Sequence, residues 1–174
     1  LASVGYYTQG PEKAVNAALT GFTKELSEEV KNLETKRKLK FRELQEKLQI
    51  KQSKEFSWFH SASHLSEFGV KVIGSFCSYL SFQPYRFGIK KPLLGFMNMS
   101  RDVPGLGKLK HDYVKISARL PKGIKSKINL GLLLQKACAD FNGIGEGHAM
   151  AASGVILKGK EEEFIAKLDE LAST

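Results

Sequence analysis

From about residue 55 onward the chain alternates strand-like runs with helix-like stripes, and this alternation limits the fold more than any other feature. The strand-like runs lie at residues 56–60, 92–97, 113–118 and 150–157, and apolar residues recur at helical spacing over residues 70–80, 130–141 and 160–171. Strands that alternate with helices indicate an α/β domain. We therefore expect an α/β fold over residues 53–174, with a small mixed β-sheet flanked by helices.

A long amphipathic helix is predicted ahead of this domain. Between residues 25 and 48 apolar side chains recur at steps of three and four without Gly or Pro, and Arg37 interrupts the stripe. A shorter helix opens at Pro11 and closes at Gly21. The basic middle of the long helix is offset by acids, which favours a solvated face over a nucleic-acid-binding one. Residues 1–52 are interpreted as the end of an upstream domain and a helical connector.

The core is expected to form from the apolar residues of the predicted strands and helices. These are Trp58, Phe59, Ile73, Phe76, Leu94, Phe96, Ile116, Leu133, Phe164 and Leu168. Ser63 or Ser66 is expected to cap the helix over residues 70–80. Phe82, Tyr85 and Phe87 are expected in the core, with an exposed docking patch as the alternative.

Positive charge is concentrated in one stretch of the chain. There are 27 Lys and Arg against 18 Asp and Glu, a net charge of +9. Residues 86–136 hold twelve of the basic residues and only two acids, so the remainder is nearly neutral. A basic stretch broken by Gly and Pro turns is typical of a groove that binds phosphates, and a generally basic surface is the alternative.

Several other classes of protein are disfavoured. No apolar run approaches the roughly eighteen residues that a membrane helix needs. Cys77 and Cys138 lie too far apart for a Cys-x-x-Cys pair, which excludes a four-cysteine zinc site and favours a reducing compartment. No P-loop or carboxylate cluster occurs, and His60 and His64 lack a third ligand nearby. We expect no catalytic residue and no metal site in this chain.

The most unusual segment runs from Gly143 to Gly154. Glycines at 143, 145 and 147 alternate with other residues, and His148 follows at once. Glycines let the backbone approach a ligand closely and offer N–H groups to an anion. Upstream, Arg119 ends a predicted strand, and a guanidinium suits bidentate phosphate binding. We expect a glycine loop and a strand-end arginine, neither with a packing role.

Together these segments resemble a known family. Lys115–Arg119, the helix start at Asn129–Gly131 and Gly145–Ser153 are similar to the C-terminal DHH-associated domain of DHH phosphoesterases. The resemblance is strongest for archaeal RecJ-like single-strand exonucleases and their GINS-associated replisome relatives, in which segments like residues 58–60 and 72–76 precede the basic strands. It covers roughly residues 55–171.

The resemblance implies a division of labour. In the family a separate N-terminal DHH domain holds two metal ions, Mn or Mg, and cleaves the phosphodiester, while the C-terminal domain grips the backbone phosphates of single-stranded nucleic acid. No cofactor is implied within this chain. Carried over, the phosphate contacts are Lys115, Ser117, Arg119, Gly145, Gly147 and His148.

Some positions depart from the family pattern. Glu146 stands where a Gly-Gly-His triplet begins, and Ser153 where a glycine follows paired alanines. A carboxylate beside an anion site repels phosphate unless it points away or pairs with a lysine. Leu1–Gln9 resembles the end of a DHH domain, with Gln9 in place of a metal-binding aspartate. With no initiating Met and no signal-peptide pattern, the chain is expected to be cut from a longer protein.

Three functions are consistent with the resemblance. The first is the nucleic-acid-binding domain of a RecJ-like single-stranded DNA exonuclease, as used in DNA repair. The second, which Gln9, Glu146 and Ser153 favour, is a non-catalytic replisome subunit that binds GINS and the MCM helicase in archaeal DNA replication. The third is a module like those of alanyl-tRNA synthetase or small-oligonucleotide phosphodiesterases. In the first two cases the protein would be cytoplasmic and nucleoid-associated, without membrane contact.

Overall fold

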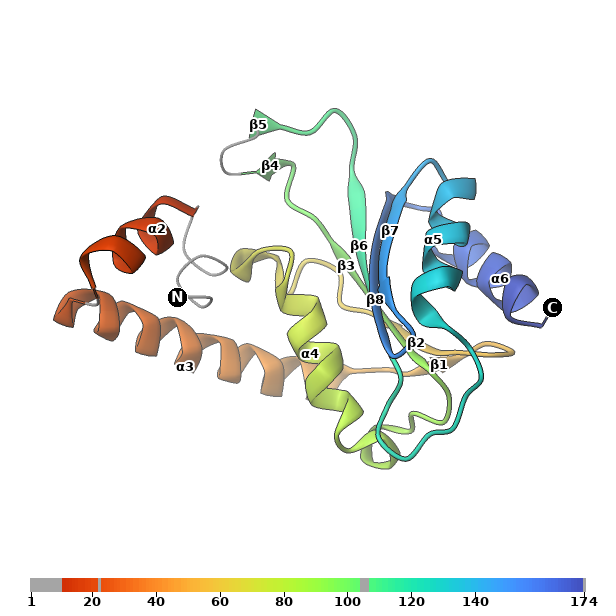
Figure 1. Ribbon diagram of the computed structural model, residues 1–174. Coiled ribbons are helices and arrows are strands. Elements are labelled where there is room, and N and C mark those ends of the chain that lie inside the picture. Colours follow the sequence, from red (N-terminus) through yellow and green to blue (C-terminus); the bar gives the residue numbers. More distant parts are fainter. Residues whose placement is uncertain (1–10, 22, 104–106, 174) are drawn as a thin grey trace.

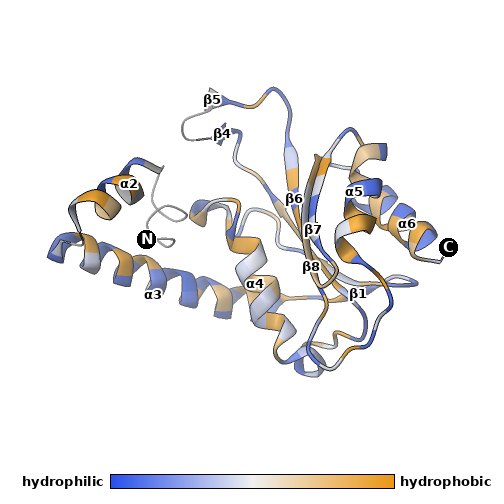
Figure 2. Cartoon of the chain, viewed as in Figure 1, coloured by the Kyte–Doolittle hydropathy of each residue, from blue (hydrophilic) through white to orange (hydrophobic). Residues whose placement is uncertain are grey.

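The chain begins with two helices. The computed structural model describes residues 11–21, 23–103 and 107–173, so Leu1–Gln9 and the interpretation of Gln9 lie outside the described residues. Helix α2 spans Pro11–Thr20 and helix α3 spans Lys24–Lys47. The Thr23 hydroxyl accepts a 3.2 Å hydrogen bond from the Leu26 amide and so caps α3. Apolar and hydrophilic residues alternate along α3 (Figure 2), as the sequence predicts for a long amphipathic helix.

A six-stranded mixed sheet forms the centre of the domain (Figure 1). Its strands are β1 (Lys51–Gln52), β2 (Ser57–His60), β3 (Leu93–Asn98), β6 (Tyr113–Arg119), β7 (Ile144–His148) and β8 (Ala151–Leu157). They lie in the spatial order β1-β2-β3-β6-β8-β7, with β2 parallel to β3 and every other neighbouring pair antiparallel. The expected α/β fold with a small mixed sheet is confirmed.

A hairpin arm projects from the sheet between β3 and β6. It carries the two short strands β4 (Asp102–Val103) and β5 (Gly107–Lys108). Figure 1 shows the arm bending toward the side on which α3 and α4 lie. At its base the Arg101 guanidinium donates to the carbonyl oxygens of Leu109 and Lys110 at 3.1 and 2.8 Å.

Helices cover both faces of the sheet. Helices α5 (Leu130–Asp140) and α6 (Glu161–Ala172) lie on one face, and α4 (Val72–Ser81) packs against β3 and β6 on the other (Figure 1). Short 3₁₀ turns at Ser66–Phe68 and Pro84–Phe87 flank α4. The outward-facing residues of edge strand β7, Ile144, Glu146 and His148, are exposed.

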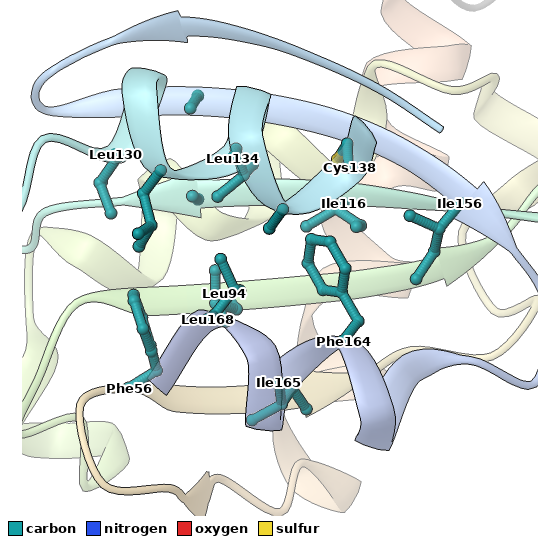
Figure 3. Packing of buried hydrophobic residues seen from close by; sticks show 14 of the residues in the cluster. Phe56, Leu94, Ile116, Leu130, Leu134, Cys138, Ile156, Phe164, Ile165 and Leu168 are labelled. Atoms are coloured by element: carbon teal, nitrogen blue, oxygen red, sulfur yellow. The ribbon is translucent and has the colours of Figure 1, made fainter. Parts of the chain in front are cut away.

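Two apolar clusters hold these layers together. Figure 3 shows the first, which packs the sheet against α5 and α6 through Leu94, Ile116, Leu134, Phe164 and Leu168. The second packs α4 on the opposite face, and Leu44 of α3 is buried in it. Apart from Trp58, every residue expected in the core is buried.

Three local expectations from the sequence are wrong. Neither Ser63 nor Ser66 caps α4; no side chain bonds to its first turn, and the Ser66 hydroxyl donates to the Ser63 carbonyl in the preceding turn. Trp58 is half-buried, with the Lys51 ammonium over its ring. In addition, two of the three aromatic residues after α4 are not in the core. Phe82 and Tyr85 are 72% and 74% exposed, whereas Phe87 packs against the second cluster.

Candidate nucleic-acid interface

Strands β6, β8 and β7 place polar side chains on one face of the sheet. Ser117 lies opposite Ser153, which in turn lies opposite Glu146. Arg119 and His148 both lie opposite Ala151 on β8. Because side chains alternate between the two faces of a strand, these residues share the face that turns away from α5. We call it the open face; its polar residues are Lys115, Ser117, Arg119, Ser153, Glu146 and His148.

A strongly basic pocket of about 830 Å³ lies between the open face, α4 and α3. Six cationic residues line it, and none of the described residues around it is Asp or Glu. They are Arg37, Lys38 and Arg42 from α3, Lys71 just before α4, and Lys115 and Arg119 from β6. Concentrated positive charge without carboxylates favours an anionic ligand with several charges. We call this hollow the basic pocket.

Arg119 is held in place by the protein itself. Its Nε donates to the Ser78 hydroxyl at 3.1 Å, and Nη1 donates to the carbonyl oxygens of Ala118 at 2.7 Å and Ala152 at 3.3 Å. Nη2 takes no part in these bonds and borders Gly74, whose added Cβ would stand 3.1 Å from it. The absence of a side chain at Gly74 therefore leaves Nη2 open to the basic pocket. Arg119 thus has a packing role, contrary to expectation.

The Ser117 hydroxyl is a buried polar group facing the same pocket. The residue is 1% exposed, and its Oγ has no oxygen or nitrogen partner among the described residues. A polar neighbour is the Cys77 thiol, whose pKa is raised by burial and lowered in part by Ser117. A buried hydroxyl without a partner is costly, because it loses its bonds to water and gains none in exchange. An oxygen-rich anion in the basic pocket would supply the missing bond.

Lys115 connects the two positions at which the sequence departs from the family pattern. Its ammonium donates to the Ser153 hydroxyl at 3.2 Å, and that hydroxyl lies 3.5 Å from Glu146 Oε1 as a long hydrogen bond. Burial, and then the nearby charge of Lys71, lower the pKa of Lys115, while Glu146 partly opposes this shift. The carboxylate is therefore linked to a lysine through Ser153, which limits its repulsion of an anion.

Gly145 and Gly147 lie in a strand, β7, and not in the expected loop. A Cβ at Gly145 would stand 2.4 Å from the Leu134 carbonyl oxygen, and one at Gly131 of α5 would stand 2.7 Å from the Gly147 carbonyl oxygen. The glycines thus let α5 lie directly against the backbone of β7. The expectation that they have no packing role is wrong, and their amides stay a predicted contact to phosphate.

His148 lies at the end of the open face and does not line the basic pocket. It is exposed, and its Nδ1 accepts a hydrogen bond from the Met150 amide at 3.4 Å. One strand separates β7 from β6, so His148 lies roughly 10 Å from Arg119 at a strand spacing of about 4.8 Å. The structure thus brings Lys115, Ser117 and Arg119 together and leaves His148 at one side.

The sequence did not indicate most of the cations in the basic pocket. Only Lys115 and Arg119 come from the basic stretch 86–136, and the other four precede it by fifteen residues or more. One signal was available: Arg37 interrupts the apolar stripe of α3, and its guanidinium lies 5.8 Å from the Phe41 ring centroid, beside the pocket. Lys38 and Arg42 are exposed, as expected of a solvated face, whereas Arg37 is half-buried, and all three line the basic pocket.

Comparison with known proteins agrees with this geometry. Residues 98–174 match the DHHA1 domain. The match begins at the end of β3 and includes β6, the glycine strand β7 and β8. It therefore contains Lys115, Ser117, Arg119 and His148, whereas α3 and α4 with the other pocket cations precede it.

Other known proteins resemble this chain over more than the residues that match the DHHA1 domain. An uncharacterized protein of Methanocaldococcus jannaschii is 36% identical over 93 residues, which is 50% of this chain; the chain spans about a fifth (21%) of that protein's length. The manganese complex of RecJ from Thermus thermophilus shares the fold with a TM-score of 0.57 and 15% identity over 93% of this chain and 22% of RecJ. A second manganese-bound structure, described as exonuclease RecJ, gives a TM-score of 0.56 at 17% identity over 94% of this chain and 36% of that one.

The described residues do not suit the metal that those RecJ structures contain. No group of three or more His, Cys, Asp or Glu side chains that could hold a metal ion occurs in the described part of the chain. His60 instead places Nε2 3.4 Å from Glu161 and accepts a hydrogen bond from the Ala62 amide through Nδ1. Within the described ranges, no helix is both long and apolar enough to cross a membrane.

Proposed function

We propose that this chain is the nucleic-acid-binding C-terminal domain of a RecJ-like single-stranded DNA exonuclease. It grips backbone phosphates for a separate DHH domain that holds Mn or Mg. The observation that carries the proposal is the buried, unpartnered Ser117 hydroxyl in a pocket lined by six cations and no described carboxylate. A phosphate oxygen supplies the acceptor that Ser117 lacks, and the cations neutralise the phosphate charge.

The residues divide the binding between them. Arg119 Nη2 and the Ser117 hydroxyl hold one phosphate at the pocket floor, while Lys38 and Arg42 of α3 reach the neighbouring phosphates from the opposite wall. Tyr79 and Phe82 line the same pocket and offer rings on which an unpaired base can stack. Unpaired bases stack in this way and paired ones do not, which favours a single strand over a duplex.

The glycine strand continues the contact surface. His148 of β7 lies at the same end of the open face as Arg119 of β6, with β8 between the two strands. The amides of Gly145 and Gly147 also belong to the edge strand β7. A strand that leaves the basic pocket along this edge meets these groups next. They extend the electrostatic contact without being part of the pocket itself.

A second candidate function is a non-catalytic replisome subunit that binds GINS and the MCM helicase. The exposed rings of Phe82 and Tyr85 favour it, since large exposed apolar groups often mark protein interfaces. Tyr85 does not line the basic pocket, so Tyr85→Ser separates the two functions. We expect it to leave DNA binding unchanged; loss of GINS binding by this variant would support the second function.

The decisive experiment measures binding of a fluorescently labelled single-stranded DNA across a salt series. Gly74→Ala is the sharpest variant, because its added Cβ would lie 3.1 Å from Arg119 Nη2 and 3.6 Å from Ser117 Oγ and so cover both. Alanine also stabilises a helix relative to glycine by about 1 kcal/mol, so folding should not suffer. Lys136→Ala removes an exposed cation from α5, on the other face, and serves as the control.

We expect Gly74→Ala and Arg119→Gln to weaken binding about tenfold, while Lys136→Ala has little effect. Loss of one phosphate contact should also reduce the slope of log affinity against log salt by about 0.7. Thermal unfolding of each variant shows whether it is folded. Binding that is absent from the wild type, or equal in Gly74→Ala and the wild type, contradicts the proposed phosphate site.

A further inference from the structure

A second, smaller hollow adjoins the basic pocket on the open face. It has a volume of about 360 Å³ and is formed by β6, β7, β8 and the base of the arm. Lys115 and Ser153 line both hollows, so the two lie side by side. We call the second one the apolar pocket.

The lining of the apolar pocket differs sharply from that of the basic pocket. Its walls are mainly the apolar side chains of Met99, Leu109, Tyr113, Ile144 and Val155. Ile144 is 75% exposed, so it forms an open side of this hollow. Among the described residues that line it, Lys115 is the one cation, so this hollow is a poor phosphate site. Flat apolar groups suit it better.

One carboxylate stands at the border of this pocket. Glu146 is the only acidic residue among the described residues that line it. Its Oε1 lies 3.5 Å from the Ser153 hydroxyl, which accepts a hydrogen bond from the Lys115 ammonium at 3.2 Å. An ionised carboxylate only accepts hydrogen bonds. The pocket therefore suits a flat ligand that carries N–H donors on one edge.

We propose that the apolar pocket holds one nucleobase of the bound strand and that Glu146 accepts hydrogen bonds from that base's N–H groups, with guanine favoured. This inference rests on the proposed function, because the basic pocket must hold the same strand. Guanine offers two neighbouring donors, N1–H and the N2 amino group, which match the two oxygens of a carboxylate. Adenine and cytosine offer one amino group each. Thymine places a carbonyl oxygen on both sides of its single N–H, and these oxygens repel Glu146.

The distance between the two pockets limits which nucleotide of the strand can place its base in the apolar pocket. Strand β6 has seven residues from Tyr113 to Arg119, and these six steps span about 20 Å. The base in the apolar pocket therefore belongs to a nucleotide beyond the one whose phosphate contacts Arg119. Sequence preference is expected at one internal position of the strand.

The test uses a labelled ten-nucleotide thymidine strand and a set of strands with one guanine moved along it. We expect one internal guanine position to bind about tenfold tighter than the all-thymidine strand, as a good two-bond base contact gives. Glu146→Gln removes the charge and adds a donor, so it should abolish this preference while binding of the all-thymidine strand persists. Glu162→Gln, on exposed α6 surface outside both pockets, is the control and should keep the preference.

The outcomes separate the two proposals. A guanine preference that persists in Glu146→Gln, or no preference at any position, overturns the base site and leaves the phosphate site standing. An equal rise in affinity for every strand in Glu146→Gln also overturns it, because Glu146 would then act only as a repelling charge. Failure of the wild type to bind any strand overturns both proposals.

Discussion

Gly145 lies so close to α5 that one added methyl group should push the helix away from β7. A Cβ there would stand 2.4 Å from the Leu134 carbonyl oxygen. A carbon and a carbonyl oxygen in contact stay about 3.3 Å apart, so the helix must shift by roughly 1 Å. The obstacle is backbone, and no change of side-chain rotamer removes it. We expect Gly145→Ala to lower the free energy of unfolding by about 3 kcal/mol, the upper end for overpacking.

Thermal unfolding followed by circular dichroism measures this effect. In a chain of this size each kcal/mol changes Tm by about 2–4 °C, so Tm should fall by roughly 6–12 °C. Gly159→Ala is the control, because its φ is +89° and nothing lies within 4 Å of the added Cβ. It should lose only about 1–2 kcal/mol through backbone strain. Gly131→Ala tests the same contact from the helix and should also lose stability, although alanine is the better helix former.

A Gly145→Ala protein that unfolds no earlier than Gly159→Ala refutes the packing argument. A Gly145→Ala protein that keeps its stability but no longer binds single-stranded DNA assigns the Gly145 amide to the phosphate instead. The two roles of the glycine are thus separated by two measurements on one variant.

Four further predictions concern stability, pH and thiol chemistry. Lys115→Met should weaken DNA binding yet leave the free energy of unfolding at neutral pH unchanged or higher, because burial lowers the pKa of Lys115 and its charged form opposes folding. In urea titrations at several pH values, wild-type stability should therefore rise relative to the variant as the pH passes upward through the folded-state pKa. Phe164→Ala, which removes a fully buried ring, should cost about 3–5 kcal/mol in the same assay. Asn129→Ala removes the side chain that accepts from the Leu132 amide and should cost about 1 kcal/mol. Burial raises the pKa of Cys77 to about 12 and of Cys138 to about 11, so iodoacetamide at pH 8 should label neither until urea unfolds the protein, as mass spectrometry would show.

The elements of the domain could be predicted from local pattern alone. Strand β6 alternates apolar and polar residues, and α5 repeats apolar residues at helical spacing after its Asn129 cap. Both patterns reflect burial on one face, which the sequence records directly. The glycine strand β7 was not predictable in this way, because glycine disfavours strands unless another backbone must come close. In this fold the backbone that comes close belongs to α5, which packs directly against β7.

The basic pocket could be predicted only in part. Its two β6 cations lie in a motif of known spacing, whereas Arg37, Lys38, Arg42 and Lys71 reach it through the packing of α3 and α4. Nothing local in the sequence shows that α3 crosses near β6. The pairing of Glu146 with Ser153 could have been predicted from the sequence, because counting outward from the turn after His148 places the two residues opposite each other.

The three hydrogen bonds that hold Arg119 determine how the pocket meets its ligand. A long arginine side chain forfeits up to about 2 kcal/mol of rotamer entropy when it becomes fixed. Arg119 has already lost this freedom on folding, through Ser78, Ala118 and Ala152. The exposed side chains of Lys38 and Arg42 lose their rotamer entropy only when a strand binds. A bound strand should therefore be most ordered beside the preorganised guanidinium of Arg119 and progressively looser along α3.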